Sequence, residues 1–135
     1  GRALSCHQDQ EGLEGRCSVV LASATDLLQG PRTNLTDFKV DGLVLQQLDT
    51  DKVVACYRTA GGSSCSVLQL VSGAEMTQGA PLQVSFEQTY HLSMARLAED
   101  RALLCSQKGI YTWSCHVLTA TGAVLGGGTP FVVSE

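Results

Sequence analysis

The residues of this chain best suited to chemistry are its six cysteines, which fall into three local pairs. The members of the successive pairs are eleven, nine and ten residues apart. Cysteines can form disulfides, bind a metal or supply a nucleophile, and six of them allow fifteen disulfide pairings. The three local pairs are Cys6 and Cys17, Cys56 and Cys65, and Cys105 and Cys115.

Metal binding and nucleophilic catalysis are the weaker interpretations of these cysteines. The chain has no C-x-x-C motif, and structural zinc requires four ligands at close spacing. His7 and His116 each adjoin a cysteine, but Tyr57 and Ser66 stand beside the middle pair. Neither these histidines nor His91 lies in a recognisable nucleophile motif. We therefore expect no metal, no cofactor and no enzyme activity.

Candidate sites outside the cysteines are few. The triplet Asn-Leu-Thr fits the acceptor pattern for N-glycosylation at Asn34, on condition that the chain enters the secretory route. The carboxylates at Asp51 and Asp100 are fewer than calcium requires, so we expect them to cap their turns. Tyr111 and Trp113 are candidate contact residues for a partner or a sugar, unless they cover a neighbouring sheet.

An internal repeat with a period of 48 to 50 residues relates the three cysteine pairs. The segments GRALSCHQ, DKVVACYR and DRALLCSQ each hold the first cysteine of a pair, and an apolar run follows each second cysteine. Farther along each copy, a glycine closely precedes a proline. We call residues at the same place in different copies matched. Because each copy holds one pair, the repeat selects the pairing in which Cys6–Cys17, Cys56–Cys65 and Cys105–Cys115 each form a disulfide.

Each complete copy predicts four short strands. In the middle copy these are residues 42–48, 51–58, 65–71 and 82–86, with a Gly-x-Pro turn leading into the last one. Apolar runs of this length between turn residues are typical of β-structure. The first copy begins at the second strand, so the chain holds eleven expected strands. Eleven strands make fewer than three complete four-stranded units, whereas a closed propeller needs four to eight such units as its blades.

The second strand of each copy is apolar on both of its faces. Val54 and Cys56 alternate with Val53 and Ala55, as in a sheet that is covered on both sides. We therefore predict an all-β, propeller-like array of four-stranded antiparallel blades, and the alternative is a β-trefoil. The predicted units are a partial repeat at residues 1–41, a second repeat at 42–90 and a third at 91–135.

These units resemble the tandem repeats, about 48 residues long, of large bacterial and algal proteins that are predicted to form β-propellers. The shared pattern is L-x-x-x-x-[KR]-x-[LV]-x-[CAY], a Gly-rich hairpin, V-L-x-[LA] and then G-x-P. The resemblance implies an adhesive, secreted or scaffolding role. The paired cysteines depart from it, because the related repeats often have alanine, tyrosine or a small residue there.

Composition excludes some classes of function. The net charge of −4 disfavours a nucleic-acid partner, and no apolar run approaches the length of a membrane-spanning helix. The chain starts without methionine or a signal segment, so we expect a processed product or a fragment. Disulfides would place it outside the cell, in the secretory pathway or in an organelle lumen, whereas reduced, buried thiols are the alternative.

From these observations we predict a non-catalytic structural or interaction module, which acts as a scaffold or accessory subunit of a larger assembly. Its expected partners are other protein subunits or further repeats of the same chain, because an incomplete ring leaves strand edges open. We expect an oligomer or part of a longer chain. The alternative is a lectin-like domain that binds glycans, and an enzyme is the third class.

Overall fold

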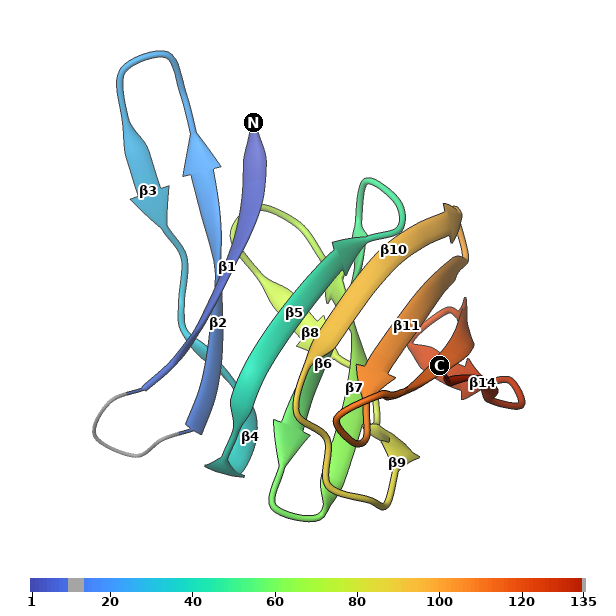
Figure 1. Cartoon of the computed structure of the whole chain (residues 1–135). Coiled ribbons are helices and arrows are strands. Elements are labelled where there is room, and N and C mark those ends of the chain that lie inside the picture. The colour runs from blue at the N-terminus through green and yellow to red at the C-terminus, as the bar shows by residue number, and fades with distance from the viewer. Residues whose placement is uncertain (10–13, 135) are drawn as a thin grey trace.

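The computed structural model describes residues 1–9 and 14–134, which form three antiparallel β-sheets and no helix (Figure 1). The all-β prediction is confirmed, and none of the three sheets is closed into a barrel. The first sheet contains β1 (Arg2–Gln8), β2 (Glu14–Ala22), β3 (Leu27–Gln29) and β4 (Thr33–Lys39).

The middle and last sheets share one strand order. The middle sheet contains β5 (Asp41–Gln47), β6 (Lys52–Thr59), β7 (Gly62–Leu70), β8 (Met76–Gln78) and β9 (Leu82–Ser85). The last sheet contains β10 (Leu92–Ala98), β11 (Arg101–Gln107), β12 (Thr112–Thr121), β13 (Val124–Gly127) and β14 (Phe131–Ser134). Within the described residues of the first sheet, no strand occupies the place that β5 and β10 hold in theirs.

The outer strand of each sheet is split into two short strands. Both β8 and β9 pair with β7, and the same holds for β3 and β4 on β2 and for β13 and β14 on β12. At the break, a glycine amide donates a hydrogen bond of 2.8–2.9 Å to a carbonyl of the neighbouring strand. These bonds join Gly30 to Val19, Gly79 to Val67 and Gly128 to Val117.

This geometry corrects the interpretation of the Gly-x-Pro segment as the turn into the fourth strand. The hairpin turn lies earlier in each copy, and the strand begins before the glycine, as β8 does at Met76. The proline that follows, such as Pro81, has no amide hydrogen to offer the ladder, so pairing stops and resumes in β9. The short strands β3, β8 and β13 were not predicted.

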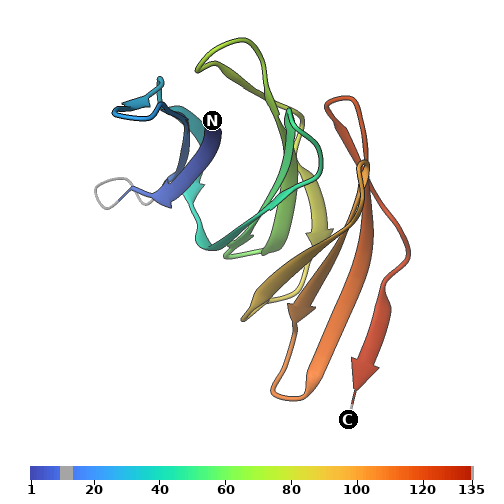
Figure 2. The same ribbon diagram turned by 90° about the horizontal axis from the view of Figure 1, so that it is seen from above.

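The middle sheet is covered on both faces, as the apolar residues on both faces of β6 predicted. Figure 2 shows it between the other two sheets, so that the three sheets lie in chain order. Val53, Ala55 and Tyr57 lie in a core with the first sheet, whereas Val54 and Cys56 lie in a core with the last sheet. Two apolar layers therefore hold the three sheets together.

The three predicted disulfides are present. Each joins directly opposite residues of two neighbouring strands, at Cα–Cα distances of 4.1, 4.1 and 4.0 Å. They are Cys6–Cys17, Cys56–Cys65 and Cys105–Cys115. Intramolecular disulfides of this number are typical of extracellular and secretory proteins.

Polar contacts also connect the first two sheets. The Nη2 atom of Arg2 lies 2.6 Å from Oδ1 of Asp51, so this carboxylate forms an ion pair across the interface. The aspartate that caps the turn is instead Asp49, whose Oδ1 accepts a hydrogen bond of 2.7 Å from the amide of Thr50. Asp100 likewise pairs with the neighbouring Arg101. The described part of the chain contains no helix capable of spanning a membrane.

Candidate interaction surface

The last sheet packs one face on the middle sheet and leaves the other face open. Directly opposite residues of paired strands share a face, so the register places the apolar side chains of alternate positions together. We call this surface the outer face; it comprises Leu103, Trp113, Val117, Phe131, Val133 and the Cys105–Cys115 disulfide.

Comparison with matched residues shows how unusual this exposure is. Val19 in the first sheet and Val67 in the middle sheet are both 0% exposed, because the next sheet covers them. Val117 occupies the same place in the last sheet and is 39% exposed. Phe131, opposite Cys115, is 70% exposed. The outer face thus has the composition of a buried layer but no sheet over it among the described residues.

The two aromatic residues predicted as contacts lie in different surroundings. Trp113 is on β12, opposite Gln107 and Val133, and belongs to the outer face. It therefore points away from the middle sheet and does not cover it. Tyr111 lies in the hairpin between β11 and β12 and is largely exposed. A binding role for either residue remains a prediction.

Asn34 is exposed on β4, as a residue carrying a glycan must be. Thr36, the third residue of the acceptor triplet, is buried: its hydroxyl donates a hydrogen bond to the Phe38 carbonyl at 2.8 Å and accepts one from the Gly15 amide at 3.2 Å. In the folded chain the asparagine is thus accessible while the threonine serves the local structure. Glycosylation itself remains a prediction.

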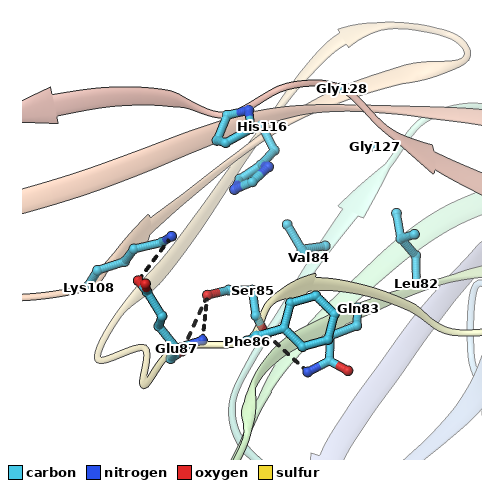
Figure 3. Close-up of a pocket in the computed structure, with 11 residues that line it drawn as sticks. Leu82, Gln83, Val84, Ser85, Phe86, Glu87, Lys108, His116, Gly127 and Gly128 are labelled. Carbon is cyan, nitrogen blue, oxygen red and sulfur yellow. Dashed lines mark hydrogen bonds and ion pairs between the residues drawn. The ribbon is translucent and has the colours of Figure 1, made fainter.

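A hollow of about 350 Å³ lies between the middle and last sheets (Figure 3). The ring of His116 faces it from β12, and Nζ of Lys108 lies 3.3 Å from the Glu87 carboxylate at its side. The loop after β9 contributes Phe86. A histidine, a lysine and a carboxylate thus come together in this hollow.

The environment of His116 favours its neutral form. Burial lowers the pKa of His116, and the nearby charge of Lys108 lowers it further, while a hydrogen bond with the Gly128 backbone raises it. Its Nε2 lies 3.4 Å from Oγ of Ser114. This serine is fully buried, so a substrate carbonyl has no access to its hydroxyl. Ser114 therefore lacks the access to substrate that a serine nucleophile needs.

A second hollow of about 390 Å³ occupies the corresponding place between the first and middle sheets. Each of the two lies between the final strand of one sheet and the Gly-x-Pro segment of the next, with Gly79 in one and Gly128 in the other. Tyr57 lines the second hollow, and burial raises the pKa of its hydroxyl, offset by a hydrogen bond with Ser66. Because the hollows recur with different side chains, sheet packing explains them better than a dedicated ligand site.

The structure does not bring the other candidate residues together. His7 is exposed on the first sheet and His91 precedes β10, so neither approaches His116 in the hollow of the last sheet. Within residues 1–9 and 14–134, no group of three or more His, Cys, Asp or Glu side chains is placed to hold a metal ion.

The outer face was not predicted from the sequence. The matched positions show that this face is apolar, since Val117 continues the series Val19 and Val67, and Leu103 continues Leu4 and Val54, but they do not show that it is exposed. Comparisons of the chain with protein-family models, curated proteins and solved structures found no significant match. Function must therefore be argued from these surfaces.

Proposed function

We propose that this chain is a non-catalytic structural or interaction module, which serves as a scaffold or accessory subunit of a larger extracellular or luminal assembly. The observation that carries the proposal is the outer face, where Val117 and Phe131 are exposed at 39% and 70%. An apolar surface of this kind, centred on a disulfide and flanked by Trp113, is suited to binding protein.

We also propose that the three sheets are blades of a propeller-like array, in the manner of the tandem repeats that the sequence resembles. Three separate sheets with apolar layers between them support this arrangement. A β-trefoil would instead join strands of its units in one barrel, and no sheet here is closed. The disulfides and the exposed Asn34 support a secreted or luminal location.

Binding to protein is preferred over binding to sugar because the aromatic residues do not recur. Trp113 is matched by Ser63 in the middle copy, so a lectin with one sugar site in each repeat is not supported. The outer face, in contrast, uses the positions that hold Val19 and Val67 inside the molecule. A glycan array tests the alternative: specific binding there, lost on Trp113→Ala, would favour the lectin.

The proposal is tested by affinity capture from an extract of secreted and luminal proteins. The matched variants are Val117→Arg, on the outer face, and Phe86→Arg, an 80% exposed residue of the loop after β9. We expect the wild-type chain and Phe86→Arg to retain the same proteins, and Val117→Arg to lose them. Retention that is indifferent to Val117, or no retention at all, would contradict the proposal.

A further inference from the structure

We infer that the outer face binds a second copy of this chain, specifically the open face of that copy's first sheet, so that copies associate head to tail. The inference rests on the proposed role as an interaction module and names one partner for its surface. It follows from a rule that the two existing interfaces obey.

The rule concerns which face of a sheet covers which. The disulfide face of the first sheet, with Cys17 and Val19, packs on the middle sheet. The disulfide face of the middle sheet, with Cys56, Cys65 and Val67, packs on the last sheet. In both cases the covering face is the one without the disulfide. The same pair of face types therefore meets twice within one chain.

Among the described residues, one face of each type remains open. The last sheet presents a disulfide face, and the first sheet presents the opposite face, where Ala3 lies across from Val20 and Ser5 lies across from Ser18. Two disulfide faces packed together would form a contact unlike either existing interface. A head-to-tail contact repeats the interface that the chain already forms twice, so continuity favours a second copy in this orientation.

The open face of the first sheet has suitable chemistry. Its central residues are small or apolar, as are their matches in the covering faces of the other sheets: Ala3, Ser5 and Val20 match Val53, Ala55 and Leu68, and also Ala102, Leu104 and Leu118. The charge on this face is compensated, because Arg16 forms ion pairs with Asp9 at 2.9 Å and Glu14 at 3.4 Å.

Glycine contacts give an independent argument for the same stacking. A Cβ atom added to Gly30 would lie 2.6 Å from the Ala74 carbonyl oxygen of the next sheet, and one added to Gly79 would lie 1.8 Å from that of Ala123. Gly128 is the third member of this series, but an added Cβ would meet only its own sheet, at 3.4 Å. Gly128 therefore leaves room for a turn of a neighbouring sheet, and a second copy can provide that turn.

Two copies would bring six sheets together, which is within the range of closed propellers. A heterologous contact closes into a ring when its rotation allows and otherwise extends into a chain of copies. Either product is heavier than one chain, whose mass is 14.3 kDa.

Sedimentation of the oxidised, purified chain tests the inference. We expect a mass at least twice 14.3 kDa at about 100 µM protein for the wild type and for Phe86→Arg. Val117→Arg and Ser5→Arg, on the two opposed faces, should each raise the dissociation constant at least tenfold. Both residues are exposed, and circular dichroism with thermal unfolding verifies that each variant is folded. A folded wild-type chain that sediments as a monomer overturns the inference.

Mixing the two variants distinguishes head-to-tail association from a symmetric contact. The Ser5→Arg chain keeps its outer face, and the Val117→Arg chain keeps the open face of its first sheet. We therefore expect an equimolar mixture to form heterodimers at concentrations where each variant alone remains a monomer. An oligomer that resists Ser5→Arg, or a mixture that stays monomeric, contradicts head-to-tail binding.

These outcomes separate the inference from the proposed function. A monomeric chain that still captures other proteins through Val117 overturns the second-copy inference and leaves the module's role intact. An oligomer that obeys the mixing test, but captures no other protein, supports self-association and contradicts the role as an accessory subunit.

Discussion

At the residue scale, the three disulfides share one connectivity but differ in their surroundings. Cys56 and Cys65 are both fully buried between two sheets, whereas Cys105 and Cys115 lie partly exposed on the outer face. Each closes a loop of similar length, so each should stabilise the fold by about 2–3 kcal/mol through the unfolded chain. Their accessibility to a reductant must nevertheless differ, because thiol–disulfide exchange requires the attacking thiolate to reach a sulfur atom.

We therefore predict an order of reduction under native conditions. Cys105–Cys115 should be reduced first and Cys56–Cys65 last, with at least a tenfold difference in rate. Partial reduction, alkylation and peptide mapping at about 1 µM protein would measure the order. Repeating the experiment at 100 µM should slow the reduction of Cys105–Cys115 selectively, since a second copy would cover it. Earlier reduction of the middle disulfide would show that burial does not govern access.

His116 provides a second prediction at this scale, concerning pH. Burial lowers its pKa below the ordinary value of 6.5, so the unfolded chain takes up a proton at a higher pH than the folded chain does. The free energy of unfolding should therefore fall as the pH decreases through about 6.5 and below. Denaturant unfolding at pH 7.5, 6.5 and 5.5 would measure this loss.

The control for this prediction is His116→Gln, which keeps a polar side chain of similar size but does not titrate. Its free energy of unfolding should depend less on pH than that of the wild type over the same range. His7 and His91 are present in both chains, as are Lys108 and Glu87 beside the ring. Equal pH dependence in the two chains would assign the effect to groups other than His116.

At the element scale, the split outer strands set how closely neighbouring sheets approach. Gly79 interrupts the outer strand of the middle sheet and lies against the turn of the last sheet. A methyl group there would overlap the Ala123 carbonyl, at 1.8 Å, and backbone cannot yield as a flexible side chain does. The contact between sheets thus depends on the absence of a side chain at one residue of an edge strand.

We predict that Gly79→Ala lowers the free energy of unfolding by about 1–3 kcal/mol, the usual cost of overpacking. Gly128→Ala is the matched control and should change it by less than about 0.5 kcal/mol, because its Cβ meets nothing closer than 3.4 Å. Both substitutions belong in the Val117→Arg background, where association does not contribute. Chemical denaturation would measure both, and equal losses would argue against this contact between the sheets.

The same scale shows what sequence can and cannot predict. Val53, Val54, Ala55 and Cys56 are all apolar or small, and this run predicted a strand covered on both faces, because each face of a strand takes every second residue. The cysteine pairing followed from the repeat. The short strand at Met76–Gln78 was missed, because three residues before a Gly-x-Pro segment carry too little periodicity to be distinguished from a turn.

Exposure of the outer face was beyond such reasoning for a different reason. Val117 has the same residue type as Val67, which is fully buried, and both stand two residues after a cysteine and directly before a leucine. Local pattern determines which face of a strand is apolar, but the presence of another sheet over that face depends on the whole assembly. A surface of this kind is recognised only by comparing the burial of matched residues in the folded chain.

At the scale of the whole molecule, self-association must be compatible with a glycan at Asn34. Asn34 lies opposite Arg16 in the register, on the open face of the first sheet. Its matches on the other sheets are Gln83 and Val132, which face a neighbouring sheet and yet stay exposed, Val132 at 57%. The outer-strand position of Asn34 therefore lies beyond the area that a stacked sheet covers, and a glycan there would project past a second copy.

We predict that glycosylation at Asn34 leaves head-to-tail association unchanged, within about threefold in dissociation constant. Sedimentation of chain produced in a glycosylating host, before and after enzymatic removal of the glycan, would measure this. The matched control is Ala3→Asn, which creates the acceptor triplet Asn-Leu-Ser at the centre of the same open face. A glycan on that residue should abolish association, because it would occupy the area where Val53 and Ala102 are covered by a neighbouring sheet. If removing the glycan from Asn34 strengthened association tenfold, the contact would cover Asn34 itself, which contradicts the packing seen between the stacked sheets of this chain.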